Sequence, residues 1–516
     1  MKTNLSSTTP SQLETDCLVV VTLDRSEKDR TDKDKDRDKD GEKGAPSVES
    51  ADAAVAGAAK EVLASGEVTG KTFETTLLHN PTGLKAKRLL LLGGGKAKSF
   101  TATELRKLAG AAVRTLKGKS LRSFAFVLPE SGIAAPDAVR AIVEGAIIGS
   151  FDPGYYKSKD KSNNNNKDQK IEALTIVVPS GDQKSLESAL EVGRIIGESQ
   201  NFTRDLVNEP SNLMTPNILA ERARKMASEV GLVCESFGAD KIKALKMGAF
   251  WGVAQGSDEP PALIVLRYDP VGAVDKVHLG LVGKGVTFDT GGISIKPADG
   301  MEKMKYDMAG AATMIGAMRA IALLKPKVKI TAVVLATENM PSGKAQKPGD
   351  VQIAMSGKSI EIINTDAEGR LILADGLAYA RELGCTHLVD AATLTGAIVV
   401  ALGYVNAGIF ASTDEMYERF LAANKQAGEK MWRMPLDDEY KDLIKSNIAD
   451  MVNAGSRYGG AIFAAMFLKE FAEDTPWIHL DIAGTAWMED NKPWIAKGPS
   501  GIALRSLVEF VKGWDS

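Results

Sequence analysis

The chain carries at residues 364–375 the stretch NTDAEGRLILAD, in which Asp366, Glu368 and Arg370 occupy alternate positions. Alternate side chains of an extended segment point the same way, so these three charged groups are predicted to converge on one side of it. The glycine before Arg370 permits a sharp bend, and a helix is predicted to begin at Leu371. Two carboxylates beside a guanidinium indicate metal ligands next to an anion-binding arginine. The alternative is an ion-pair cluster at the surface.

Further charged residues lie upstream, around a glycine-rich segment. The apolar run at 277–282 is predicted to be a buried strand, and GKGVTFDTGG follows it at 283–292. Glycine-rich segments directly after buried strands are where α/β proteins place functional residues, so this one is predicted to be a functional loop. Lys284 and Asp289 lie in it, and Asp307 follows. By itself Lys284 could be an ordinary solvated lysine, and Asp307 could cap the helix after it.

The acidic residues of the two regions are Asp289, Asp307, Asp366 and Glu368. They carry a formal charge of about −4, which two divalent metal ions would balance; without metal some of them would take up protons. Oxygen ligands suit Mn, Mg or Zn better than soft ions. A lysine amine binds a metal only when neutral, and two nearby dications favour that form. The four histidines form no HExxH or HxH motif, which excludes a zincin-type site.

Several long blocks of the chain resemble the leucyl aminopeptidase family, the cytosolic aminopeptidases with a dinuclear metal site. The resemblance is specific because the blocks occur in the family's order. The clearest are VGKGVTFDTGGISIKP at 282–297, MKYDMAGAATMIGA at 304–317, NTDAEGRLILADGLAYA at 364–380 and DAATLTGA at 390–397. The resemblance is continuous from about residue 200 to residue 516 and is loose before that.

The resemblance implies a role for each matching residue. One metal ion would be held by Lys284, Asp289, Asp307 and Glu368. The other would be held by Asp289, Asp366 and Glu368, with help from the backbone carbonyl of Asp366. Lys296 and Arg370 would be the catalytic pair. The substrate would be bound by Met304, Thr393, Leu394 and Gly396.

These roles imply a hydrolytic mechanism. Two metal ions roughly 3.5–4 Å apart can activate a water and polarise the scissile carbonyl, while Lys296 would stabilise the oxyanion. A general base is also needed, and arginine cannot serve because it stays protonated. The resemblance implies that a bicarbonate ion held by Arg370 acts as the base, and that the two divalent ions are Mn or Zn.

We therefore expect a metal-dependent aminopeptidase that releases N-terminal residues from peptides, with leucine and other apolar side chains preferred. A dipeptidase acting on Cys-Gly and similar dipeptides is the alternative within enzymes. A regulatory DNA-binding role and a non-catalytic relative are the alternatives outside them. The intact ligand set argues against the non-catalytic relative, and the near-neutral N-terminal part offers no strong basic patch for nucleic acid. The resemblance also implies a homo-hexamer.

The composition fits a soluble cytoplasmic enzyme. A length of 516 residues favours two domains, and a net charge of −3 gives no general attraction to nucleic acid or membranes. The three scattered cysteines argue against a disulfide framework and for a reducing compartment. The polar N-terminal residues do not read as a signal peptide, and no apolar run of about 18 residues or more suggests a membrane span.

The order of predicted elements places the chain in the α/β class. We expect a smaller N-terminal α/β domain at 1–183, a connecting helix at 184–210, and a larger catalytic α/β domain with a central mixed sheet at 211–516. Two segments are predicted to interrupt the N-terminal domain. A charged run at about 25–48 is predicted to be a disordered insertion, and 157–170, which contains four consecutive asparagines, to be a low-complexity loop.

Overall fold

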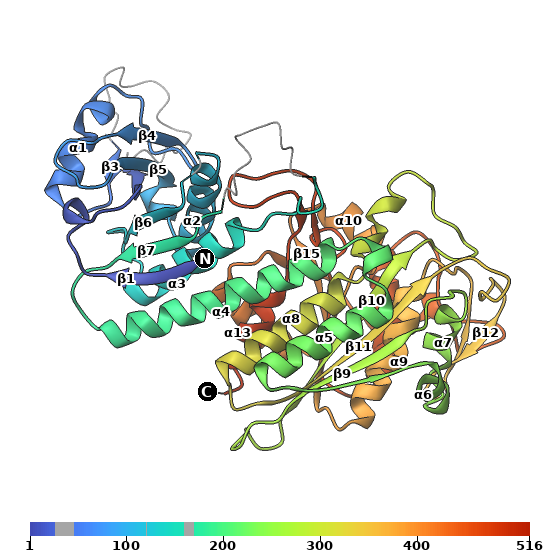
Figure 1. Ribbon diagram of the computed structural model, residues 1–516. Coiled ribbons are helices and arrows are strands. Elements are labelled where there is room, and N and C mark those ends of the chain that lie inside the picture. The colour runs from blue at the N-terminus through green and yellow to red at the C-terminus, as the bar shows by residue number, and fades with distance from the viewer. Residues whose placement is uncertain (26–45, 120, 159–169, 516) are drawn as a thin grey trace, which may run out of the picture. The chain divides into compact units, whose positions relative to one another are not determined.

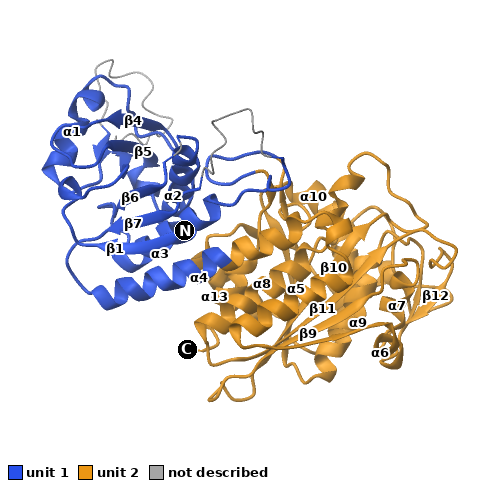
Figure 2. Ribbon diagram, in the orientation of Figure 1, with its two compact units in different colours: residues 1–198, 490–496 blue, residues 199–489, 497–516 orange. Residues whose placement is uncertain are grey.

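The computed structural model describes residues 1–25, 46–119, 121–158 and 170–515. The chain forms two compact units, of which unit 1 comprises residues 1–198 and 490–496, and unit 2 comprises residues 199–489 and 497–516 (Figure 2). Most of the charged insertion predicted at 25–48 and of the loop predicted at 157–170 lies outside the described residues.

Unit 1 is built on a sheet with the strand order β1-β7-β6-β2-β5-β4, in which β3 pairs with β2 (Figure 1). Its strands are β1 Lys2–Ser6, β2 Leu18–Asp24, β3 Ser47–Val48, β4 Thr75–His79, β5 Arg88–Lys96, β6 Ser123–Val127 and β7 Ala173–Val177. Its helices are α1 Ala53–Ala64, α2 Ala102–Lys117, α3 Ala135–Gly149 and the first part of α4, Gln183–Asn208.

Strand β2 shows how the sequence builds this unit. Val19 and Val21 belong to the core cluster that includes α2 and α3, whereas Leu18 and Val20 belong to the cluster that includes α1. Successive side chains of a strand point to opposite faces, so a strand covered on both faces is apolar at every position. The apolar run of β2 is therefore explained by burial on both faces.

A short segment near the C-terminus, residues 490–496, belongs to unit 1. Its Trp494 stacks on Phe73 with ring centroids 5.0 Å apart, and Lys107 Nζ lies 5.7 Å from the centroid of the Trp494 ring. A Cβ on Gly110 would lie 2.7 Å from the backbone oxygen of Trp494, so α2 approaches this segment more closely than a side chain would allow. The segment is thus packed into unit 1.

Unit 2 is built on an eight-stranded sheet with the order β16-β15-β18-β14-β10-β11-β9-β8. The inner strands β11, β10, β14 and β18 run parallel to one another, whereas β9, β8 and β15 are antiparallel to their inner neighbours. This confirms the predicted mixed sheet. The strands are β8 Val233–Phe237, β9 Ala262–Tyr268, β10 His278–Asp289, β11 Lys329–Asn339, β14 His387–Ala392, β15 Ala407–Ala411, β16 Met431–Arg433 and β18 Trp477–Asp481.

Helices cover both faces of this sheet. One core cluster includes residues of α5 Pro216–Val230, α8 Ala309–Leu324, α11 Asp414–Ala427 and α13 Leu504–Lys512. The other includes residues of α7 Gly248–Ala254, α9 Glu368–Glu382 and α12 Gly460–Ala472. The short elements are α6 Ala239–Ala244, α10 Gly396–Leu402, the 3-10 helices η1 Pro10–Gln12, η2 Ala97–Ser99, η3 Ser211–Leu213, η4 Met301–Tyr306 and η5 Asp438–Ile444, and the strands β12 Val351–Ile353, β13 Ser359–Glu361, β17 Met451–Val452, β19 Trp487–Met488 and β20 Gly498–Pro499.

One helical stretch among the described residues is long and apolar enough, by length and composition, to cross a membrane. It is Met301–Leu324, which contains η4 and α8. Most of its residues are buried inside unit 2, where α8 contacts β10, β11 and β14. It is therefore packed as a core helix of the α/β unit.

Candidate active site

The carboxyl ends of the four parallel strands supply the polar residues of the site. β10 ends at Asp289, β11 ends at Asn339, β14 is followed by Thr393, and β18 ends at Asp481. Parallel strands place their carboxyl ends at one edge of the sheet, which is where ligands bind in open α/β folds. The register pairs Asp289 with Asn339 and Ala392 with Asp481, so these ends are level with one another.

Only part of the glycine-rich segment predicted as a loop is a loop: Gly283 to Asp289 belong to β10, and Gly291 and Gly292 follow the strand at positive φ. Residues Gly283 to Asp289 pair with β11 as far as Asn339, with a bulge between Val286 and Phe288. A Cβ on Gly283 would lie 2.8 Å from the backbone of Ala311, so this glycine allows close packing of α8 against the strand instead of forming a turn. Lys284 therefore projects from the strand, and Asp289 is the last residue of it.

The backbone of residues 366–370 also differs from the prediction. They are not an extended segment with side chains on one side, because α9 begins at Glu368 and includes Arg370. Residues two apart on a helix do not face each other, so Glu368 and Arg370 point in different directions. A Cβ on Gly369 would lie 2.8 Å from Lys284 Nζ, so this glycine makes room for the lysine side chain. Of the three charged residues, only Asp366 precedes the helix.

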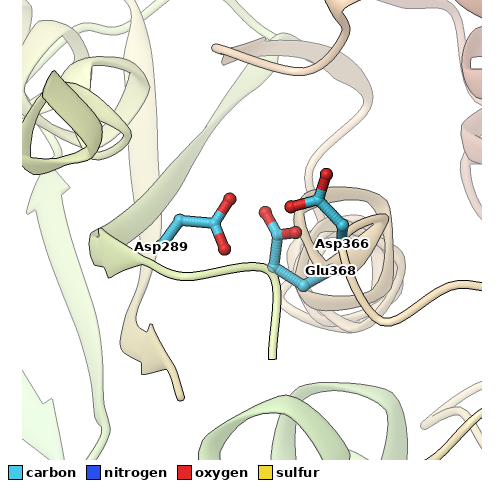
Figure 3. A group of neighbouring side chains, drawn as sticks. All are labelled: Asp289, Asp366 and Glu368. Atoms are coloured by element: carbon cyan, nitrogen blue, oxygen red, sulfur yellow. The ribbon is translucent and has the colours of Figure 1, made fainter. Parts of the chain in front are cut away.

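Three of the predicted acidic ligands converge at the sheet edge. Asp289, Asp366 and Glu368 each offer a carboxylate oxygen, and these oxygens lie within 4.8 Å of one another (Figure 3). Asp289 and Glu368 are buried, and Asp366 is half-buried. Figure 3 shows the three carboxylates directed toward a common space between the end of β10 and the start of α9.

Two lysines neutralise part of this charge. Lys284 Nζ lies 2.8 Å from both Asp307 Oδ2 and Glu368 Oε1, which brings the fourth predicted acid into the cluster. Lys296 Nζ lies 2.8 Å from Asp289 Oδ2 and is also paired with Asp366. Four carboxylates thus face two ammonium groups. Lys296 is 21% exposed at its side chain, so it is largely shielded from solvent.

The burial and charge of the cluster shift its proton affinities. Burial and the remaining carboxylates raise the pKa of Asp307, Glu368 and Asp366 above their ordinary values. Burial by itself lowers the pKa of Lys284, but the adjacent carboxylates of Asp307 and Glu368 outweigh that effect and hold its pKa above the usual value. The same balance, with Asp289 as the main neighbour, raises the pKa of Lys296. The cluster therefore carries an excess of negative charge that attracts cations.

The residues present fit divalent metal ions. The donor set is several carboxylate oxygens and one lysine amine, converging from β10, from α9 and the segment just before it, and from the residue after η4. Both lysine ammonium groups are held by these same carboxylates, which shows that the oxygens are already spaced to surround positive charge. Hard and borderline ions such as Mn and Zn accept this ligand set. Asp307 does not cap α8 as the alternative allowed, because the N-cap residue is Met308 and has no side-chain capping bond.

Arg370 lies beside the acidic cluster and is buried. Its Nη1 donates a hydrogen bond of 2.8 Å to the backbone oxygen of Asn453, and its guanidinium lies 5.3 Å from the centroid of the Phe463 ring. Its Nε has no hydrogen-bond partner among the described residues. Burial lowers the pKa of Arg370 to about 10, so it stays charged at neutral pH. An unpaired N–H on a buried cation is suited to hold an anion.

The predicted substrate-binding residues flank the cluster. Thr393 is buried, accepts a 2.9 Å hydrogen bond from Lys284 Nζ on its backbone oxygen, and donates one of 2.7 Å to Asp307 Oδ1. Leu394 is half-buried, and Gly396 is the first residue of α10 and is exposed. Met304 is half-buried in η4, and its backbone oxygen accepts a hydrogen bond from the backbone of Asp307.

An open cavity of about 570 Å³ adjoins Lys296 and Asp366. Its other lining residues are mostly small or apolar: Ser294, Ile295, Pro297, Ile363, Asn364, Ala454 and Gly455. The acidic cluster is thus reached from an open cavity beside Lys296 and Asp366.

Sequence reasoning missed one residue inside the cluster. Asn339 is buried and donates from Nδ2 to Asp289 Oδ1 at 2.8 Å and to the backbone oxygen of Thr365 at 3.1 Å. It therefore fixes the orientation of Asp289 and ties it to the segment before α9. The sequence carried no distinctive signal for it, because an asparagine at the end of a strand, as in β11, is common. His479 is fully buried and bonds Asp390 at 2.6 Å.

Comparisons with known proteins agree with this geometry. Residues 201–508 match the profile of "Cytosol aminopeptidase family, catalytic domain", and residues 34–160 match "Cytosol aminopeptidase family, N-terminal domain". The chain is 60% identical to the "Probable cytosol aminopeptidase" of Koribacter versatilis and 55% identical to that of Acidobacterium capsulatum, with 100% of both chains covered in each case.

Solved structures of similar proteins have the same fold. A tomato leucine aminopeptidase mutant superposes with a TM-score of 0.84 at 34% identity, covering 99% of this chain and 96% of the other. The bottromycin maturation enzyme BotP in complex with Mn superposes with a TM-score of 0.80 at 34% identity, covering 88% of this chain and 96% of the other.

Proposed function

This chain belongs to the cytosol aminopeptidase family, and on that premise we propose how its residues carry out the metal-dependent release of N-terminal residues from peptides. The observation that carries the proposal is the convergence of Asp289, Asp366 and Glu368, with Lys284 and Asp307 against Glu368. All these residues lie within the part of the chain that matches the catalytic domain.

We propose that the cluster holds two divalent ions, Mn or Zn. One would be held by Lys284, Asp289, Asp307 and Glu368, and the other by Asp289, Glu368, and the side chain and backbone carbonyl of Asp366. Bound there, the ions would polarise the scissile carbonyl and lower the pKa of a water molecule. Lys284 must give up its proton to become a ligand, and the charge of the ions favours this.

Lys296 and Arg370 would supply the remaining chemistry. Lys296 Nζ stands between Asp289 and Asp366 and remains protonated, so it can stabilise the negative charge that develops on the carbonyl oxygen of the substrate. Arg370 is charged and buried and has a free N–H at Nε, which suits it to hold a bicarbonate ion that takes up the proton of the attacking water. Arg370 itself does not transfer the proton.

The substrate would lie between the Thr393–Gly396 segment and Met304. We propose that the segment binds the peptide backbone and that the apolar residues around the site favour leucine and other apolar side chains. Release of the N-terminal residue then follows from recognition of the free α-amino group beside the acidic cluster. A homo-hexamer located in the cytoplasm is part of the same proposal, and it rests on the family alone.

The test is hydrolysis of leucine p-nitroanilide by purified protein after chelation and after addition of Mn or Zn. Asp366→Ala is assayed in parallel. We expect metal to restore activity in the parent and not in the variant, because Asp366 supplies part of the ligand set. Folded, metal-loaded parent without activity on this substrate would contradict the proposal. Cys-Gly would then be assayed as the substrate, and a shift in duplex DNA mobility that weakens with salt would test the DNA-binding alternative.

A further inference from the structure

The peptide unit between Thr393 and Leu394 is held at both of its polar ends. Its carbonyl oxygen, from Thr393, accepts a 2.9 Å hydrogen bond from Lys284 Nζ. Its N–H, from Leu394, donates a 3.2 Å hydrogen bond to Asp481 Oδ1. The peptide plane is rigid, so two bonds in opposite directions fix its orientation. One bond comes from the acidic cluster and the other from the end of β18.

Asp481 makes further contacts with the same segment. Its Oδ2 accepts a 2.7 Å hydrogen bond from Thr395 Oγ1, and Oδ1 also accepts one of 3.3 Å from the backbone N–H of Ala483. Thr395 Oγ1 in turn accepts a 3.0 Å hydrogen bond from the backbone N–H of Ile398, so it caps α10. Asp481 thus holds Leu394 directly and orients the hydroxyl that caps α10.

The position of Asp481 suits this role. The residue is the last of β18, is level with Ala392 of β14, and is fully buried. A buried carboxylate that accepts three hydrogen bonds has little freedom to move. Because Asp481 is fixed at the end of β18, its hydrogen bonds also restrict the movement of the segment after β14. Asp481 is not among the residues that face the proposed metal ions, and the role proposed for it is different from theirs.

We propose that Asp481 is a positioning residue that holds the Thr393–Leu394 peptide unit and the start of α10 in the orientation that binds the substrate backbone. The inference rests on the proposed function, because it assumes that Thr393 to Gly396 bind substrate. Asp481 would act through this segment and would not touch the reacting atoms. Its loss should therefore weaken substrate binding while the metal ions stay in place.

The test compares Asp481→Ala with Asp481→Asn in metal-loaded protein. An asparagine oxygen can still accept from Leu394, and its amide group can donate to Thr395, so most of the contacts survive. For leucine p-nitroanilide we expect Asp481→Ala to raise KM by about 10-fold or more with kcat within about threefold of the parent. Asp481→Asn should stay within about threefold in both. Metal content per subunit should equal that of the parent in both variants.

Thr395→Val and Thr395→Ser provide an independent pair in case Asp481→Ala does not fold. Valine keeps the shape of threonine and removes the hydroxyl, whereas serine keeps the hydroxyl. We expect KM to rise about fivefold in Thr395→Val and to return toward the parent value in Thr395→Ser. Asp375→Ala is a control, since Asp375 is also buried and also accepts backbone N–H bonds, including those of Phe250 and Met355, away from the segment. Its KM should not change.

Three results would overturn the inference. One is a parent-like KM in folded Asp481→Ala. Another is a loss of metal that parallels the loss of activity, because Asp481 would then support the metal site itself. The third is equal KM values in Thr395→Val and Thr395→Ser. An inactive parent is a different result, because it contradicts the proposed function before any variant is compared.

Discussion

The Nζ of Lys284 lies 2.8 Å from Oε1 of Glu368, although one residue is in the middle of β10 and the other begins α9. The contact requires the first turn of α9 to pack directly against the side chain of Lys284. Gly369 makes this possible, because a Cβ there would lie 2.8 Å from Nζ. The strand and the helix are therefore joined at the point where the proposed metal site is built.

Gly369→Ala should weaken metal binding without weakening helix α9. Alanine favours a helix over glycine by up to about 1 kcal/mol, so α9 by itself would not be weakened. The added methyl group would displace the Lys284 amine, and we expect at least a 10-fold loss in kcat/KM with less than the parent amount of metal per subunit. Atomic emission measures the metal. Parent-like metal content with parent-like kcat/KM would show that the lysine has room to adapt.

Lys284→Met should remove one proposed ligand while keeping an unbranched side chain. We expect one of the two ions to be lost or weakly held and kcat/KM to fall by about 100-fold or more, since both ions act on the same substrate carbonyl. The matched control is Lys347→Met, because Lys347 pairs with Asp350 at the surface and its side chain is 66% exposed. Titration of the chelated protein with Mn, followed by calorimetry, counts the sites. Two sites of unchanged affinity in Lys284→Met would remove the lysine from the ligand set.

Asn339→Ala should lower activity, and Asn339→Asp should lower it further. Alanine removes the hydrogen bond that orients Asp289, for which a decrease in kcat/KM of about 10- to 100-fold is expected. Aspartate would in addition place a carboxylate against Asp289, and the repulsion should lower activity further unless it is relieved by a proton. The pH profile of kcat/KM distinguishes the two, because only Asn339→Asp should partly recover as the pH falls. If the two variants have the same pH profile, the proposed contact between position 339 and Asp289 does not control activity.

Asp375→Asn should change how stability depends on pH. Asp375 is fully buried in α9, and burial raises its pKa from 3.8 to about 7, even though backbone N–H groups of Met355, Phe250 and Ala249 favour the charged form. The folded protein therefore holds this proton more tightly than the unfolded chain does. By linkage, stability falls as the pH rises from about 4 to about 7.

Asparagine cannot lose a proton in this range, but its amide nitrogen cannot accept one of the two N–H bonds that the Asp375 oxygens accept, so its curve is offset from that of the parent. The melting temperature of metal-loaded parent should still fall more between pH 5 and pH 8 than that of Asp375→Asn. Differential scanning calorimetry at matched ionic strength measures both curves. Parallel curves for the two proteins would show that Asp375 does not lose its proton in the folded protein within this range.

The residue types of the site were predicted from the sequence more accurately than the backbone conformation of the segments that carry them. The acids were recognised as a group because four carboxylates in one site need cations or protons to balance their charge, whereas the roles of Lys284 and Lys296 came from the resemblance to the leucyl aminopeptidase family. The alternation of Asp366, Glu368 and Arg370 was interpreted as a strand, and the glycines after Val282 as a loop. In both places the backbone conformation is set by tertiary packing. Gly369 and Gly283 are needed there because a helix approaches β10 too closely for a side chain.

Residues that act through their neighbours were harder to predict. Asn339 and Asp481 contact the site only because β11 and β18 end level with β10 and β14. That arrangement depends on the strand order of the sheet, which local sequence patterns do not contain. An asparagine or aspartate at the end of a strand is common, so neither residue stood out before the sheet was assembled.

The packing of residues 490–496 into unit 1 has a consequence for synthesis on the ribosome. Unit 1 otherwise ends at residue 198, yet Trp494, which stacks on Phe73, emerges only after nearly all of unit 2 has been translated. At roughly 5–20 residues per second this is a delay of some tens of seconds. The first unit to be translated is thus among the last to be completed, and a nascent or truncated chain would expose the surface that Trp494 covers.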